Sequence, residues 1–109
     1  MRLFVSLASS VLAVSLLAMQ PAAAHVRLAP ADEYFGQQKM SILEVGNRLR
    51  DMSRQLQSPT AKTQDVLHTA QLTEDAMRDW QRKYPGDPWL RRDRIALERV
   101  YASARRLRR

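Results

Sequence analysis

Apolar residues recur at every seventh position between residues 35 and 56, and no other feature of this sequence constrains its fold as strongly. The repeat and its intermediate positions are filled by Phe35, Ile42, Val45, Leu49, Met52 and Leu56. This spacing places the apolar side chains on one face of an α-helix. We take Asp32 as the N-cap and predict a helix over residues 32–57. Because Gly46 disfavours a helix by about 1 kcal/mol relative to alanine, we expect it to mark a close contact between helices.

Two proline-containing turns divide the remaining sequence into two further helices. Ser58-Pro59 ends the first helix and opens the second, because proline cannot continue a helix but fits the first turn of a new one. In Pro85-Gly86-Asp87-Pro88 the glycine ends the second helix, the aspartate caps the third, and the second proline begins it. We therefore predict the second helix over about 60–84 and the third over 88–107.

The connection between the first two helices is short, so they are expected to be antiparallel neighbours. No segment has the alternating pattern of a β-strand. The predicted fold class is all-α: a small antiparallel three-helix bundle over residues 32–109, with an irregular lead-in over 25–31 and a cleavable signal peptide before it.

Residues 1–24 have the pattern of that export signal. Arg2 precedes an apolar run, and the segment closes on Pro21-Ala22-Ala23-Ala24, with small residues where a signal peptidase cleaves. We expect the mature protein to begin at His25 and to work in the periplasm or as a secreted protein. A retained membrane anchor is the alternative, but the apolar run has about sixteen residues where a spanning helix needs roughly twenty. The chain has no cysteine, which excludes a lipid-modified cysteine and disulfides.

Positive charge is concentrated in the predicted third helix. The chain has 18 lysines and arginines against 11 acidic residues, a formal net charge of +7. Residues 25–87 hold nine basic and nine acidic side chains, whereas residues 88–109 hold eight arginines and only Asp93 and Glu98 as acids. These arginines are Arg91, Arg92, Arg94, Arg99, Arg105, Arg106, Arg108 and Arg109.

Two interpretations of the arginine-rich helix remain open. Arginines in the last turn stabilise a helix through its dipole by about 0.3–1 kcal/mol each and keep the protein soluble. Alternatively, they bind a polyanion such as anionic lipid head groups or envelope polysaccharide. Nucleic acid is the least favoured polyanion, because export separates it from the protein and no aromatic residue is interleaved with the terminal arginines.

Five aromatic residues are predicted to gather at one end of the bundle. They lie at the start of the first helix, the end of the second and the start of the third, as Tyr34, Phe35, Trp80, Tyr84 and Trp89. They either close the core as an aromatic plug or form a shallow pocket beside the 85–88 turn, which would bind a partner or a small apolar ligand.

No signature of a metal site, a cofactor or a catalytic centre is found. The two histidines, His25 and His68, are the only candidates for a metal site. In a hairpin that turns near residue 58, His68 lies about 25 Å from the start of the first helix, which disfavours a shared metal. The sequence has no cysteine nucleophile, paired-histidine zinc motif or glycine-rich phosphate loop. We expect a protein without enzymatic activity and without a cofactor.

One segment resembles a known family of helical repeats. Residues 84–101 contain Tyr-Pro-Gly-Asp-Pro-Trp-Leu and then Leu97-Glu98-Arg99-Val100-Tyr101. This resembles tetratricopeptide-like repeats of exported proteins, in which a Tyr-Pro turn ends one helix and the next carries leucine and tyrosine at this spacing. Glu98 stands where those repeats usually have glycine. The resemblance implies a role in binding other proteins.

The sequence thus predicts a small exported helical protein that acts as a protein-interaction or structural module of the cell envelope. Its partner would be another envelope protein or a second copy, because an 85-residue bundle with long apolar stripes gains stability by pairing. The alternative function is a cationic binder of anionic envelope surfaces through the third helix.

Overall fold

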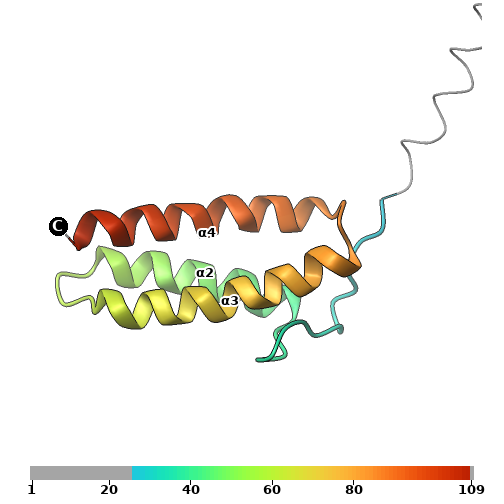
Figure 1. Cartoon of the computed structure of the whole chain (residues 1–109), viewed down its shortest axis with the longest axis horizontal. Coiled ribbons are helices and arrows are strands. Elements are labelled where there is room, and N and C mark those ends of the chain that lie inside the picture. Colours follow the sequence, from blue (N-terminus) through green and yellow to red (C-terminus); the bar gives the residue numbers. More distant parts are fainter. Residues whose placement is uncertain (1–25, 109) are drawn as a thin grey trace, which may run out of the picture.

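Three α-helices account for most of the part of the chain that the structure, a computed structural model, describes, residues 26–108. They are α2 (Ile42–Gln57), α3 (Thr63–Lys83) and α4 (Pro88–Leu107). They pack side by side, and each contacts both of the others (Figure 1). No strand is present among these residues, so the predicted all-α three-helix bundle is confirmed. The predicted signal peptide over 1–24, and the residues His25 and Arg109, lie outside the described range.

The apolar heptad positions of α2 face the interior of this bundle. Val45, Leu49, Met52 and Leu56 are all buried, as the repeat requires. The other two helices contribute Val66, Ala70, Ala76, Met77, Trp80, Leu90, Leu97, Val100 and Ala104. Burial of each large side chain stabilises the fold by about 1.5–3 kcal/mol. Thr73 is buried among them, and its hydroxyl donates to the backbone oxygen of Thr69, 2.8 Å away.

The first helix begins at Ile42, so the prediction that it starts near residue 32 is wrong. Its N-cap is Ser41, whose Oγ accepts a hydrogen bond from the backbone N–H of Glu44 at 3.2 Å, and not Asp32. The residues before Ser41 form a tight turn in which Phe35 and Met40 exchange two backbone hydrogen bonds of 2.8 and 2.9 Å. Phe35 is still fully buried, but it reaches the core from this turn.

Backbone conformation and contacts with α3 explain why the turn replaces a helix. Gly36 has a φ of 76° and Lys39 a φ of 51°, which an α-helix does not permit. The N–H of Gly36 donates to Asp79 Oδ2 at 3.0 Å, and the N–H of Gln37 donates to Asp75 Oδ2 at 2.9 Å. The bond from Gly36 is the main cause of a lowered Asp79 pKa. Two carboxylates of α3 therefore hold the turn against the bundle.

Gly36, and not Gly46, makes the close contact with a helix. A Cβ atom on Gly36 would lie 2.7 Å from Cα of Ala76, so the turn approaches α3 as closely as only glycine allows. A Cβ on Gly46 would meet only the tip of Arg50, at 3.8 Å. The expectation that Gly46 marks a close helix contact is therefore wrong.

The second helix starts at Thr63 and not near residue 60. Pro59 belongs to the connecting turn, in which the N–H of Ala61 donates to the backbone oxygen of Ser58 at 3.2 Å. The third helix has the predicted bounds, because Asp87 and Pro88 begin it as the sequence indicates. Within residues 26–108, each helix is too short or too polar to cross a bilayer.

Candidate functional site

Asp87 fixes the position of α4 against the rest of the bundle. Its Oδ1 accepts the backbone N–H of Trp89, which caps the helix, at 3.0 Å. Its Oδ2 accepts both the backbone N–H of Ala29 and the indole N–H of Trp80, each at 3.0 Å. The carboxylate is 3% exposed, so these bonds are shielded from water. One side chain thus joins the lead-in, α3 and α4.

With α4 held in this way, its arginines lie on the surface. The buried face of the helix consists of Leu90, Leu97, Val100 and Ala104. All of its arginines in the described range are exposed; these are Arg91, Arg92, Arg94, Arg99, Arg105, Arg106 and, at the C-cap, Arg108. Arg109, the eighth arginine of the predicted third helix, lies outside the described residues.

The arginines of α4 lack the ion pairs that those of α2 and α3, apart from Arg50, make. The pairs found in residues 26–108 are Arg48–Glu44, Arg54–Asp51, Arg78–Glu74, Arg82–Asp79 and Lys83–Asp79. In the same residues no α4 arginine has a carboxylate within 4.0 Å. Arg94 donates to Gln81 Oε1 at 2.8 Å and Arg106 to Ser103 Oγ at 3.0 Å, so both keep their full charge. The surface of α4 therefore carries positive charge that is not engaged in ion pairs within residues 26–108.

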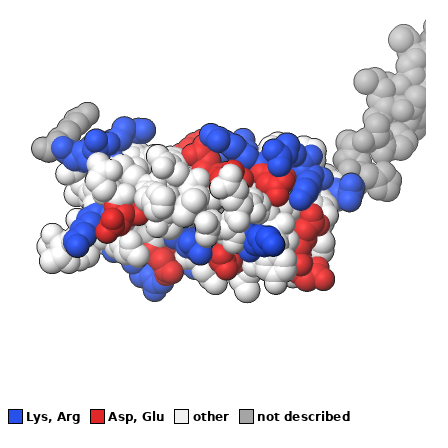
Figure 2. All heavy atoms as spheres, turned by 60° about the horizontal axis from the view of Figure 1, so that its bottom comes forward, with Lys and Arg blue, Asp and Glu red and all other residues white. Residues whose placement is uncertain are grey.

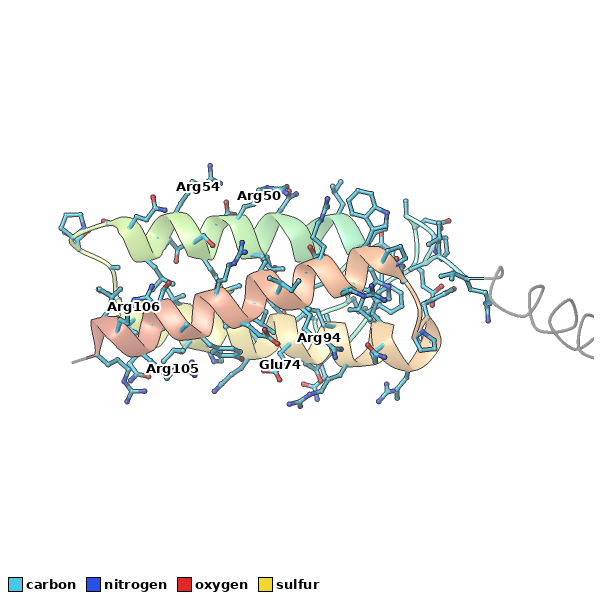
Figure 3. All side chains as sticks on the ribbon, turned by 90° about the horizontal axis from the view of Figure 1, so that it is seen from above. Arg50, Arg54, Glu74, Arg94, Arg105 and Arg106 are labelled. Atoms are coloured by element: carbon cyan, nitrogen blue, oxygen red, sulfur yellow. The ribbon has the colours of Figure 1, made fainter. Side chains whose placement is uncertain are left out.

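This charge distribution differs from that on the rest of the surface. Figure 2 views the bundle with the lower side of Figure 1 turned forward, and on this face acidic and basic groups are interspersed. On the α3 side of α4, Arg94 and Arg105 lie near the helix that carries Glu74 (Figure 3). The Tyr101 hydroxyl donates to Glu74 Oε1 at 2.6 Å, and burial raises the pKa of this tyrosine. Side-chain hydrogen bonds from Arg94 and Tyr101 of α4 to Gln81 and Glu74 of α3 thus join these two helices.

The contact between α2 and α4 is more open. Within residues 26–108 no side-chain hydrogen bond or ion pair joins these two helices, and three hollows follow one another between them. We call this the α2–α4 groove. The basic residues that line it are Arg50 and Arg54 of α2 and Arg92, Arg99 and Arg106 of α4. Figure 3 views the bundle from this side, with the labelled Arg50 and Arg54 on α2 and Arg106 on α4.

The aromatic residues separate into a buried cluster and two exposed rings. Phe35 stacks on Trp80 with ring centroids 5.9 Å apart and meets the edge of Tyr84 at 6.1 Å. The Tyr84 hydroxyl donates to Glu33 Oε1 at 2.5 Å, and this bond is the main reason that its pKa is raised. These three residues close the core, as the plug interpretation expects. Tyr34 and Trp89, by contrast, are 61% and 50% exposed.

Trp89 borders an apolar hollow at the aromatic end of the α2–α4 groove, which we call the Trp89 hollow. It has a volume of about 330 Å³. It is lined by Ala31, Ile42, Leu43, Gly46, Arg50, Trp80, Trp89, Arg92 and Asp93. This hollow contains two of the five predicted aromatic residues, Trp80 and Trp89, but it lies between α2 and α4 and not beside the 85–88 turn, where the sequence predicts the pocket. A separate hollow lies beside the 85–88 turn, and it is lined largely by polar groups of Gln81, Asp87, Arg91 and Arg94.

Asp93 is the acidic residue of the Trp89 hollow. Burial raises the pKa of its carboxyl group, while the positive charges of Arg92 and Arg50 oppose that rise. The sequence indicates Arg92 but gives no reason to select Leu43, Arg50 or Asp93. The seven-residue steps from Leu43 to Arg50 and from Arg92 to Arg99 are the signal that could have placed them along one groove.

The structure brings no metal ligands together in the described part of the chain. His68 is an exposed residue of α3, and residues 26–108 contain no cluster of three or more potential ligands. The other histidine, His25, lies outside these residues. Comparison with family models, curated proteins and solved structures found no match to this chain.

Proposed function

We propose that this chain is an exported, non-enzymatic protein that binds anionic surfaces of the cell envelope through the arginines of α4. The observation that carries the proposal is the absence of a carboxylate within 4.0 Å of any α4 arginine in residues 26–108, whereas every arginine and lysine within α2 and α3 except Arg50 forms an ion pair. Uncompensated arginines on a rigid helix retain their charge for an external anion. The export signal expected over residues 1–24 supports an envelope location.

The disposition of the apolar residues also favours this function over a protein partner. The sequence suggests that the long apolar stripe of α2 pairs with another protein, and the tetratricopeptide-like segment implies the same. In the bundle, however, the buried residues of that stripe, Val45, Leu49, Met52 and Leu56, already pack against α3 and α4. A protein partner stays a prediction that this packing does not require.

The expected strength of the interaction follows from three arginines that lie in the first, middle and last parts of α4. We call Arg91, Arg99 and Arg106 the outer arginines; all three are exposed. A basic residue at an anionic lipid surface contributes about 1 kcal/mol. Removing all three should therefore weaken binding by about 3 kcal/mol, or roughly 100-fold.

The test compares two triple variants that lose the same charge. The first is Arg91→Gln, Arg99→Gln, Arg106→Gln. The second is Arg48→Gln, Arg78→Gln, Arg82→Gln, whose arginines pair with Glu44, Glu74 and Asp79. Binding is measured by co-sedimentation with vesicles of phosphatidylcholine that contain phosphatidylglycerol, and by retention on immobilised heparin as an anionic polysaccharide.

The proposal predicts a loss of roughly 100-fold for the first variant and a loss of a few-fold at most for the second. Equal losses would mean that net charge alone governs the interaction, and undiminished binding of the first variant would refute the role of α4. Preference for vesicles or for heparin identifies which anionic surface the protein uses. Circular dichroism of each variant verifies that the bundle is intact.

A further inference from the structure

The Trp89 hollow combines apolar walls with two positively charged groups at one place. Its apolar lining comes from four separate segments: Ala31 of the lead-in, Ile42 and Leu43 of α2, Trp80 of α3 and Trp89 of α4. Leu43 is 68% exposed and Trp89 is 50% exposed, although both are large apolar residues. Such residues normally gain from being covered, so the two helices present an incompletely covered apolar surface at this point.

The guanidinium groups of the hollow have donors to spare. Arg92 lies over the Trp89 ring, with its central carbon 4.0 Å from the ring centroid. Arg50 donates to the Asn47 side chain on its own helix. Neither forms an ion pair within residues 26–108, and each arginine has five N–H donors. Arginine at such a position binds a carboxylate through parallel hydrogen bonds.

The charges that line the hollow sum to a single positive charge. Arg50 and Arg92 each contribute one, and Asp93 subtracts one when it is ionised. The nearby Arg54 pairs with Asp51, and the Asp87 carboxylate is engaged by Ala29, Trp80 and Trp89. A ligand with one negative charge therefore complements the site.

Gly46 gives the hollow its depth. Glycine is a poor residue for a helix interior, and no packing contact requires it here, because an added Cβ would meet only the Arg50 side chain at 3.8 Å. A larger side chain at position 46 would extend into the hollow that this residue lines. Glycine at position 46 thus leaves the space between α2 and α4 open.

We propose that the Trp89 hollow is a binding site for a small amphiphile that has one carboxylate head and one apolar chain. The apolar chain lies against Ile42, Leu43 and Trp89, and the carboxylate accepts hydrogen bonds from Arg50 and Arg92. The volume of about 330 Å³ lies at the lower end of the range for small-molecule sites, about 300–1,000 Å³, which suits a medium-chain fatty acid. The inference goes beyond the proposed function, because it assigns a discrete site for one molecule and does not use the outer arginines.

The experiment titrates the full chain with decanoate, kept below its micelle concentration, by isothermal calorimetry. The site predicts one decanoate per chain. Acetate has the head group without the chain, and decyltrimethylammonium has the chain with the opposite charge, so neither should bind measurably. Decyltrimethylammonium binding as tight as that of decanoate would overturn the proposal, as would no decanoate binding or several equivalent molecules per chain.

Variants then locate the site. Arg92→Gln should weaken decanoate binding about tenfold, because it removes a charge-assisted hydrogen bond. Arg94→Gln is the matched control on the same helix, since Arg94 binds Gln81 on the α3 side, and it should bind decanoate as the unchanged protein does. Gly46→Leu should abolish binding by filling the hollow. If Gly46→Leu and Arg92→Gln, both folded by circular dichroism, bind decanoate normally, the site is elsewhere and the proposal is wrong.

These measurements separate the two proposals. Gly46→Leu leaves the outer arginines in place, so it should keep its affinity for anionic vesicles and for heparin. The triple variant of the outer arginines should keep its affinity for decanoate, because Arg50 and Arg92 are unchanged. If the unchanged protein binds vesicles or heparin but not decanoate, only the amphiphile site is refuted. If it binds decanoate but neither vesicles nor heparin, only the proposed function is refuted.

Discussion

Replacing Asp87 by alanine should nearly unfold the bundle, because one carboxylate holds three segments together. The substitution removes the N-cap of α4, a loss of about 1 kcal/mol. It also leaves the backbone N–H of Ala29 and the indole N–H of Trp80 without their acceptor. Each buried donor without a partner costs about 1–3 kcal/mol. The expected destabilisation is therefore about 3–7 kcal/mol.

This loss is comparable with the whole stability of the fold. A domain with the 83 residues described here is stable by about 4–12 kcal/mol, at roughly 0.05–0.15 kcal/mol for each residue. Urea unfolding followed by circular dichroism and tryptophan fluorescence measures the change. Asp87→Asn should lie between alanine and the unchanged protein, since an amide keeps one acceptor oxygen but cannot accept all three bonds.

Asp32→Ala is the matched control for this prediction. Asp32 is the cap that the sequence suggests for the first helix, but it is exposed and ten residues from the observed start of α2. Its replacement should change stability by less than about 0.5 kcal/mol. A loss below about 1 kcal/mol for Asp87→Ala, or an equal loss for both variants, would refute the role that we assign to Asp87.

Three further predictions concern other parts of the chain. Gly36→Ala should destabilise the bundle by about 2–5 kcal/mol in urea unfolding, because it introduces left-handed backbone strain and a clash with Ala76. Gly46→Ala should stabilise the bundle by about 1 kcal/mol in the same assay. A change of the same sign for both variants would contradict the assigned roles. Because burial raises the Asp93 pKa, ionisation of this residue lowers the stability of the fold as pH rises through that pKa. Asp93→Asn should therefore stabilise the fold at neutral pH and lose this advantage in acid. A stability difference that does not change with pH would contradict this role of Asp93. Mass spectrometry of protein recovered from the cell envelope should give an N-terminus at His25, and an uncleaved leader would argue for a membrane anchor.

The parts of the fold that local signals determine could be predicted from the sequence. The Asp87 and Pro88 pair begins α4 where it is expected, because a cap and a proline act within one helical turn. The start of α2 could not be predicted in this way. Phe35 fits the heptad pattern and is buried, but the turn around it depends on bonds from Gly36 and Gln37 to carboxylates about forty residues away.

The candidate site follows the same division. The exposure of the α4 arginines follows from the apolar pattern of that helix, since a helix that buries one face must expose the other. The Trp89 hollow depends on how far apart α2 and α4 lie, and no local pattern contains that distance. The sequence places Trp80 and Trp89 at one end of the bundle but gives no indication that Arg50 and Asp93 would join them at a groove.

The salt dependence of binding to anionic vesicles tests the central claim most directly. Dissociation constants for the unchanged protein are measured on vesicles with and without phosphatidylglycerol as the salt concentration rises from about 0.05 to 0.5 M, over which screening shortens the reach of charge about threefold. If the arginines of α4 bind anionic surfaces, the affinity for the anionic vesicles falls steeply across this range and zwitterionic vesicles bind weakly throughout. An affinity that is independent of salt, or equal for both kinds of vesicle, would contradict the account.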